Sequence, residues 1–367
     1  MTLTTLIGCS ADIGNIRDAF TDIFADSSEC SSISPHTLDN APMDADFSVT
    51  FLDVGQADAA VIQSNGHYML IDGGNKDDSS LIYQYLLLHD ITHLDLVIGT
   101  HADEDHIGGL AGAFHFADAD LTLCSTDTYD SDAFRDFKKY AFLRGGGISI
   151  PSVGDTHSLG DAVVEILAIN SGDESNDSSI VTKITYGETS FLFTGDAEAA
   201  TEQFLLDSGT DLHADVLKVG HHGSANSSSG PFLSAVQPSY SVVSVGENIY
   251  GHPNNDVLNR LSMADSTVLR TDVYGDIFFT SDGTSVSCYT EFSPNSEVRE
   301  SISATLESNV ESSHYETTYI LNTRSKKFHI PTCESVEKMS ENNKLEFQGS
   351  REEVLELKYE PCGGCRP

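Results

Sequence analysis

The stretch Thr100–Leu110 reads THADEDHIGGL and directly follows a run of apolar β-formers, LDLVI at 94–98. Such a run predicts a short buried strand, so the polar stretch lies on the loop at its carboxyl end, where α/β proteins usually carry their chemistry. The loop holds four residues that can bind a divalent transition metal: His101, Asp103, Asp105 and His106. With this spacing, two of the side chains can point to one side of the loop and two to the other. Such an arrangement suits two metals bound next to each other along the loop. An ordinary polar loop on an acidic surface is the simpler alternative, but this spacing rarely occurs by chance.

The loop resembles the metal-binding signature of the metallo-β-lactamase fold, usually His-x-His-x-Asp-His, with Asp103 at the second His. With that replacement, the motif resembles the one in the hydrolase domain of ComEC-type competence proteins. The resemblance covers roughly residues 47–290 and includes five further motifs: FLDVGQADA at 51–59, LIDGG at 70–74, FTGDAE at 193–198, LKVGHHGS at 217–224 and YGHP at 250–253. It implies an α/β fold, the metallo-β-lactamase αββα sandwich, with two divalent metals, zinc or manganese, in a hydrolase domain at 47–292.

The 367-residue chain is strongly acidic, with 57 Asp and Glu against 19 Lys and Arg, a formal net charge of −38. This surface repels nucleic acid at low salt, and it favours a halophilic source, where salt screens the repulsion. Residues 313–367 hold eight Lys/Arg and nine Glu, whereas the rest hold 11 basic and 48 acidic residues. This change in the balance of basic and acidic residues predicts a second domain. No apolar run approaches the roughly 18–20 residues of a membrane span.

Residues 1–46 are rich in Ser and Asp and predict a mobile leader. Within them, LIGC at 6–9 resembles a lipobox, whose Cys9 would carry a lipid anchor and make the leader a lipoprotein tether. However, only eight residues precede Cys9 and none is basic, so the usual signal-peptide layout is missing. A cell-surface or extracellular lipoprotein and a cytoplasmic protein both stay open.

Periodicity and turn residues predict the elements between the motifs. Three strands form a meander from Phe47 to Asp72, and an apolar run at 278–289 closes the sheet. Helices are expected at 79–89, 110–116, 132–143 and 197–206, and further strands at 163–169, 180–186, 190–194, 215–219 and 239–245.

Three later motifs supply further site candidates. Asp196 follows a predicted hairpin, and its carboxylate can bridge two cations, although an Asp there could also cap a helix. His221 and His222 are adjacent after a strand and should point to opposite sides, so that one faces the metals while the other contacts substrate or packs; which of the two faces the metals stays open. His252 resembles the family's last metal ligand.

The resemblance also assigns roles other than metal binding. A matching Asp in the family stands near the metals and orients a ligand, which here is Asp72. The candidate substrate contacts are Asp72, Ser178 and Ser224. Asp53 and Asp58 are expected to fix the turn at Gly55 rather than bind metal.

One family ligand is missing from this sequence. No His occurs between 157 and 213, where ordinary members carry one, and the competence-type branch has an Asn/Ser motif that residues 176–179 resemble. The first metal site is therefore one ligand short, with Asp177 as a weaker replacement.

After a polar linker at 293–316, residues 317–367 carry a second set of ligands. Its members are His329, Cys333, Cys362 and Cys365, which suit one structural zinc ion; a redox Cys pair is the alternative. A module this small has little core, so the metal would supply folding energy. It resembles the zinc domain of Ada-type DNA-repair proteins, with His329 where that family has Cys, so methyl transfer is not expected.

Together these features predict a two-domain hydrolase that cleaves phosphodiesters in DNA with a metal-activated water. Asp105, Asp196 and His222 are the candidate catalytic residues. Asp103 makes the site oxygen-rich and shifts preference toward manganese. Two alternatives remain: a hydrolase of a lactone, thioester or cyclic nucleotide on the same fold, or a DNA-binding or uptake accessory with a vestigial metal site.

Overall fold

In the computed structural model of the protein, the described residues are 36–38, 41–42, 44–172, 175–292, 317–329, 331, 333–340, 343–349, 354 and 357–362. The chain divides into two units, Met1–Ser293 and Pro294–Pro367. Cys9, Cys365, most of the predicted leader and all of the predicted linker lie outside the described residues. The lipid anchor, the tether and the linker therefore stay predictions.

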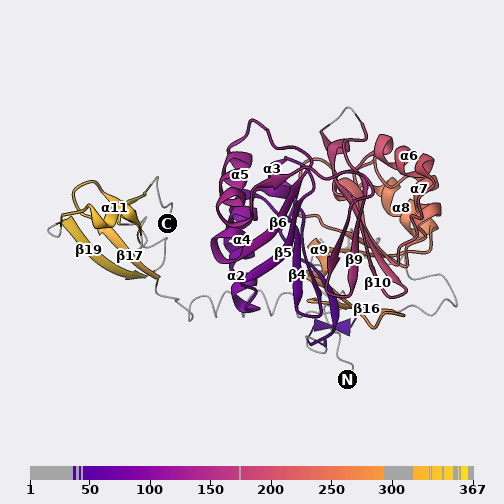
Figure 1. Cartoon of the computed structure of the whole chain (residues 1–367), viewed down its shortest axis with the longest axis horizontal. Helices are drawn as coiled ribbons and strands as arrows, with labels where there is room; N and C mark the ends of the chain where they lie inside the picture. The colour runs from indigo at the N-terminus through magenta and orange to yellow at the C-terminus, as the bar shows by residue number, and fades with distance from the viewer. Residues whose placement is uncertain are drawn as a thin grey trace, which may run out of the picture. The chain divides into compact units, whose positions relative to one another are not determined.

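One layer of the first unit is a sheet with the strand order β1-β16-β15-β2-β3-β4-β5-β6-β7, nine strands within the described residues (Figure 1). Its strands are β1 (His36–Thr37), β2 (Phe47–Phe51), β3 (Ala59–Ser64), β4 (His67–Gly73), β5 (His93–Gly99), β6 (Asp118–Cys124), β7 (Ile148–Ser149), β15 (Ile277–Ser281) and β16 (Val286–Thr290). Strands β2, β3 and β4 form the expected antiparallel meander, and β4 to β7 run parallel.

The second layer is a sheet with the order β14-β13-β12-β11-β10-β9-β8, seven strands in the described part of the chain. These are β8 (Thr156–Leu159), β9 (Ala162–Ala168), β10 (Val181–Tyr186), β11 (Thr189–Phe193), β12 (Val216–Lys218), β13 (Tyr240–Val243) and β14 (Thr267–Arg270). Strands β10 and β11 form the predicted hairpin, and β11 to β14 run parallel. Both sheets thus have a parallel half, whose carboxyl ends can carry a shared site.

Aromatic side chains fill the space between the two sheets. The rings of Phe51 and Phe193, from opposite sheets, lie 5.5 Å apart between centroids, and Tyr240 lies 5.3 Å from Phe279. Alternate residues of these strands point inward, so each strand supplies one apolar face to this core.

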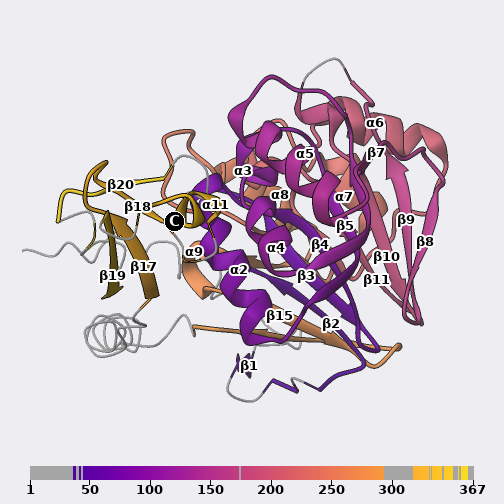
Figure 2. The same ribbon diagram turned by 60° about the vertical axis from the view of Figure 1, so that its left-hand side comes forward.

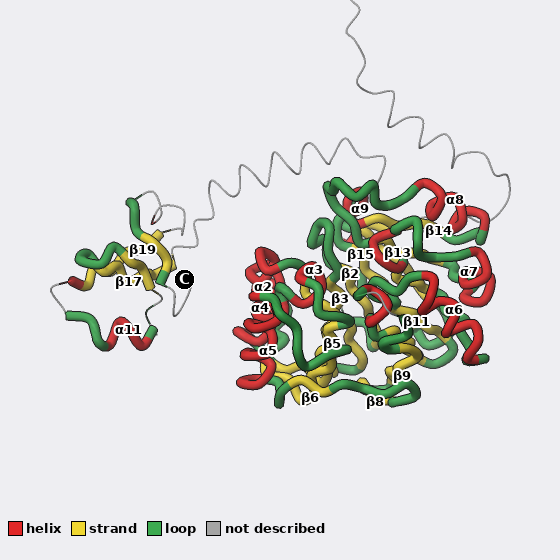
Figure 3. Tube along the Cα trace, turned by 90° about the horizontal axis from the view of Figure 1, so that it is seen from above, coloured by secondary structure: helices red, strands yellow, loops and turns green. Residues whose placement is uncertain are grey.

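Helices cover the outer face of each sheet and close two further cores. On the nine-stranded sheet lie α2 (Ser79–Leu88), α3 (Glu104–Ile107), α4 (Leu110–Phe116) and α5 (Asp132–Arg144). On the seven-stranded sheet lie α6 (Ala199–Ser208), α7 (Gly230–Val236) and α8 (Asn255–Met263). Figure 2 looks onto the neighbouring helices α2 and α4, and Figure 3 shows helices on both sides of the strands. The predicted αββα sandwich is confirmed.

The second unit is built on a sheet with the order β19-β17-β18-β20. Its elements are β17 (Thr317–Asn322), β18 (Lys327–His329), α11 (Glu334–Glu337), β19 (Lys344–Gly349) and β20 (Glu360–Pro361). Its small apolar core is formed by Tyr319, Leu321, Phe328, Val354 and Tyr359. Across both units, no helix in the described ranges is long and apolar enough for a transmembrane span.

Candidate metal centre

The loop that follows β5 packs tightly against the end of β4. A Cβ atom added to Gly109 would lie 1.9 Å from the carbonyl oxygen of Gly73, so no larger side chain fits there without a backbone shift. The amide of Gly109 donates to the carbonyl of Gly74 at 3.0 Å. This close approach explains the paired glycines after the ligands and brings two strand ends into one site.

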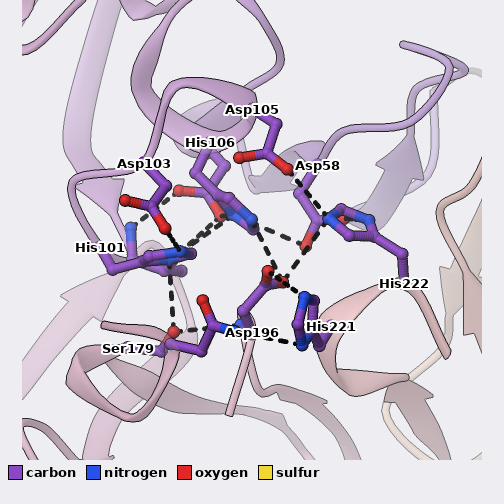
Figure 4. Close-up of polar contacts among 12 residues, drawn as sticks. Asp58, His101, Asp103, Asp105, His106, Ser179, Asp196, His221 and His222 are labelled. Carbon is purple, nitrogen blue, oxygen red and sulfur yellow. Dashed lines mark hydrogen bonds and ion pairs between the residues drawn. The ribbon is translucent and has the colours of Figure 1, made fainter. Parts of the chain in front are cut away.

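Four side chains from both sheets converge on one point (Figure 4). They are Asp105, His106, Asp196 and His222, which each offer a ligand atom within 4.8 Å of the others. Nε2 of His106 lies 3.2 Å from Oδ1 of Asp196. Nε2 of His222 lies 3.4 Å from Oδ2 of Asp105 and 3.7 Å from Oδ1 of Asp196.

Four polar atoms around this point are buried and lack a hydrogen-bond partner within the described part of the chain. They are Nε2 of His101, His106 and His222 and Oδ1 of Asp196. A buried polar atom without a partner is costly, and divalent cations bound here would satisfy these four atoms. The donor set, imidazole nitrogen with carboxylate oxygen, is one that zinc and manganese accept. The residues present therefore fit the expected metals.

Asp72 holds one of these imidazoles from behind. Its Oδ2 lies 2.9 Å from Nδ1 of His106, and its Oδ1 accepts the amide of Thr100 at 2.7 Å. Asp72 thus orients His106 and presents Nε2 to the metals, which is the role that the resemblance implies. Because Asp72 is only 1% exposed, the expected substrate contact at this residue is wrong.

A buried ion pair supports the other imidazole. Nζ of Lys218 lies 2.7 Å from Oδ2 of Asp58, whose Oδ1 lies 3.3 Å from Nδ1 of His222. The expectation that Asp58 fixes the Gly55 turn with its side chain is therefore wrong; the carboxylate faces the site instead. Asp53 does hold that turn, because its Oδ1 accepts the amide of Gly55 at 3.2 Å. Lys218 was not foreseen, although a lysine inside an otherwise apolar strand was a visible signal.

These contacts set the protonation of the cluster. Burial opposes ionisation of Asp196, but the charges of His106 and His222 outweigh it and hold the pKa of Asp196 well below its usual range. Burial lowers the pKa of His222, but the charges of Asp196 and Asp58 have a larger opposite effect and raise it to about 10. The carboxylates thus stabilise positive charge beside them. Protons on the imidazoles supply that charge, and bound cations would supply it in their place.

His101 and Asp103 form the other side of the site. Oδ2 of Asp103 lies 3.5 Å from Nε2 of His101, and the interaction with this imidazole lowers the pKa of Asp103 to about 2. Ser179 stands behind His101, with Oγ at 3.3 Å from Nδ1, and also accepts the amide of Asp196 at 3.0 Å. Ser179 thus links His101 to Asp196 in the segment where the family's missing His was expected.

Asp177 and Ser178, from the same segment, take other positions. Oδ1 of Asp177 accepts the amide of Glu198 at 3.1 Å and the hydroxyl of Thr201 at 2.8 Å, at the start of α6. The carboxylate is occupied as a cap, so Asp177 does not replace the missing ligand. Oγ of Ser178 lies 3.4 Å from Oγ of Ser125, and its substrate contact stays a prediction.

His221 and His222 both face Asp196, contrary to the expectation that they point to opposite sides. Nε2 of His221 lies 3.7 Å from Oδ2 of Asp196, while its Nδ1 lies 2.8 Å from Oε1 of Glu198. Both histidines have left-handed backbones, φ +48° and +50°, so the alternation of an extended strand does not apply.

Two other predicted residues lie outside the four-residue set. The ring of His252 lies 5.1 Å from that of His221 between centroids, beside the site, and its metal ligation stays a prediction. Oγ of Ser224 accepts the amide of Asn226 at 3.4 Å within a turn, and its substrate contact also stays a prediction.

The second unit holds a separate cluster. His329, Cys333 and Cys362 are buried, and each offers a ligand atom within 4.8 Å of the others. Sγ of Cys333 lies 3.5 Å from Nδ1 of His329. This nitrogen and sulfur set suits zinc, and Cys365 is the predicted fourth ligand.

A sequence profile of the metallo-beta-lactamase superfamily matches residues 52–247. The chain belongs to this superfamily. It is 31% identical to ComE operon protein 3 of Bacillus subtilis over 62% of this chain and 32% of that protein. It is 30% identical to competence protein ComA of Neisseria gonorrhoeae over 63% of this chain and 32% of that protein. The chain thus spans about a third of these relatives, and the resemblance to ComEC-type competence proteins is confirmed.

Among solved structures, the metallo-beta-lactamase fold protein YhfI of Bacillus subtilis aligns over 62% of this chain and 97% of that chain, with TM-score 0.43 and 16% identity. The superfamily makes this protein a metal-dependent hydrolase and implies divalent metals at the centre described above.

Lys218→Met should destabilise the metal-free protein by about 3 kcal/mol, because it leaves the buried carboxylate of Asp58 without its cation. Adding Asp58→Asn should restore much of the loss. Urea unfolding in EDTA, followed by circular dichroism, measures both variants. Equal losses in the single and the double variant would contradict the account of this pair.

Replacing Cys333 and Cys362 together by Ser should lower bound zinc by one equivalent and leave the first unit's metals in place, because the two clusters share no residue. Metal content by mass spectrometry of the dialysed protein measures this. Unchanged zinc would refute the second cluster.

Proposed function

We propose that the first unit hydrolyses phosphodiester bonds in DNA. The observation that carries the proposal is the position of Asp196, whose two oxygens face different donors. Oδ1 lies 3.2 Å from His106 and Oδ2 lies 3.7 Å from His221. A carboxylate placed in this way can bridge two cations, as two-metal hydrolysis of phosphodiesters requires. The relatives named for competence, together with Recombination protein 2 of Haemophilus influenzae, support DNA as the substrate.

The two ions would have separate ligands apart from Asp196. Asp105, His106 and His222 would hold one, and His101, Asp103 and His221 would hold the other. When bound, the ions bring the pKa of a water near neutrality and offset charge on the phosphoryl oxygens. Asp103 supplies oxygen where the family usually supplies nitrogen, which favours manganese over zinc.

The protein's own groups keep this arrangement rigid. Asp72 and Asp58 hold the imidazoles of His106 and His222 through Nδ1, so that both present Nε2. Burial raises the pKa of Asp105, but interactions with His222 and His106 outweigh it and lower the pKa, so the carboxylate is ionised at neutral pH and would accept a hydrogen bond from a water held at the metals. Orienting that water is the role we assign to Asp105.

Asp105→Ala should lower kcat on DNA at least about 100-fold, because it removes the carboxylate that orients the attacking water. The protein should stay folded, because the loop lies at a strand end. The matched control is Glu104→Ala, which removes an exposed carboxylate from the same short helix. Initial rates with manganese, zinc or EDTA measure the effect. Full turnover in Asp105→Ala at unchanged metal content would refute the mechanism.

Cleavage should rise from low salt to molar KCl. Most DNA-binding proteins lose affinity as salt increases, but here salt also screens repulsion from a chain of net charge −38. Initial rates on DNA against KCl concentration test this. A steady fall, in protein that circular dichroism shows to be folded throughout, would contradict a halophilic interpretation.

A further inference from the structure

The loop between β13 and α8 is closed by the side chain of one residue, Asn248. Its Nδ2 donates to the carbonyls of Gly246 at 2.9 Å and His252 at 2.8 Å. Its Oδ1 accepts the amides of Tyr250 and His252, both at 3.1 Å. Four hydrogen bonds from one side chain hold the loop in a single shape and tie its tip to His252.

The tip of this loop presents two apolar side chains to solvent. Ile249 is 96% exposed and Tyr250 is 71% exposed. Single exposed apolar residues are common on protein surfaces. Here two are adjacent on a loop whose backbone is held by the four hydrogen bonds of Asn248. A ring held in this way loses little conformational entropy when a ligand stacks on it.

The loop is also fixed relative to the metal centre. The Oε1 atom of Gln56 accepts the amide of Gly246 at 3.5 Å, and its Nε2 lies 3.5 Å from Nδ1 of His252. The ring of Tyr250 lies 5.8 Å from that of His252, which lies 5.1 Å from His221. Tyr250 therefore stands two imidazole rings away from Asp196, at the rim of the site.

A second tyrosine stands at the other side of the centre. The hydroxyl of Tyr129 donates to Oδ1 of Asp103 at 2.8 Å, and the residue is 43% exposed. Figure 4 places Asp103 and His222 on opposite sides of the cluster. Aromatic rings thus flank the metal centre, whereas the nearby guanidinium of Arg135 is paired with Asp130 and Asp132.

The exposed rings and the pairing of Arg135 bear on whether single-stranded or duplex DNA is the better ligand. Duplex binders gain affinity from many Lys and Arg contacts to phosphates, and their specific contacts read base edges in the grooves. Single strands instead offer unpaired bases that stack on aromatic side chains, which tolerates any sequence. Exposed rings beside the metal centre, with Arg135 already paired to carboxylates, fit the second mode better than the first.

We propose that Tyr250, supported by Ile249, is a stacking platform for an unpaired base beside the scissile phosphate, and that the enzyme takes single-stranded DNA in preference to duplex. The inference rests on the proposed function and assigns its substrate class.

The test compares a single-stranded oligonucleotide with an otherwise identical one that carries a run of abasic sites. In the wild type, kcat/KM should be higher for the oligonucleotide with bases, by about fivefold or more, and higher for the single strand than for its duplex. Tyr250→Ala should bring the ratio of base-containing to abasic close to one, through KM. Tyr250→Trp should keep the ratio high, because it keeps a flat ring. Phe142→Ser, which removes a 76% exposed ring on α5, is the control and should keep the wild-type ratio.

The outcomes separate the two proposals. If the oligonucleotides are cleaved but Tyr250→Ala keeps the wild-type ratio, the platform is refuted and the phosphodiesterase stands. If no diester is cleaved with manganese or zinc, the proposed function is refuted. Fluorescence anisotropy of the same oligonucleotides then still tests the platform, which falls if wild type and Tyr250→Ala bind the base-containing strand equally.

Discussion

Four carboxylates meet where the parallel halves of the two sheets end, and Lys218 is the lysine that pairs with one of them in the buried interior. The carboxylates belong to Asp58, Asp72, Asp105 and Asp196. Those of Asp58, Asp72 and Asp196 are buried, and so much negative charge away from water is unstable unless cations balance it. Protons on His106 and His222 supply part of that balance, and the nearby carboxylates therefore raise the pKa values of both imidazoles. Divalent metals would supply more of it and would use the nitrogen and oxygen atoms that have no hydrogen-bond partner among the described residues.

The fold makes this concentration of charge tolerable by holding each group from behind. Asp72 fixes His106, the pair of Asp58 and Lys218 fixes His222, and Glu198 fixes His221. Each support comes from a strand end or a short loop packed against one, so the ligands cannot relax toward solvent. Substrate contacts can lie on more exposed loops. The loop closed by Asn248 combines the two properties, since it is rigid in its backbone but presents exposed side chains.

The αββα fold followed from the resemblance of the metal loop and five further motifs to the metallo-β-lactamase family, whereas local signals were sufficient for most of the strands and helices and for the position of the metal loop. The apolar run before His101 and the spacing of its ligands are properties of a short segment, and the hairpin before Asp196 is another. Contacts between distant segments were not predictable in this way. Lys218 and Asp58 are 160 positions apart, and only the packing of both sheets shows that they form a pair. The orientation of His221 and His222 was missed because it depends on left-handed backbone angles rather than strand alternation. Asp177 resembled a ligand by position, but its carboxylate caps α6.

The central claim is that the unpartnered atoms around Asp196 are metal ligands. Anomalous diffraction from crystals grown with manganese, and separately with zinc, tests it most directly. The account predicts strong anomalous density beside Asp196, within bonding distance of Nε2 of His106 and of His222. Well-ordered density for these side chains with no anomalous signal between them, at saturating metal, would contradict it.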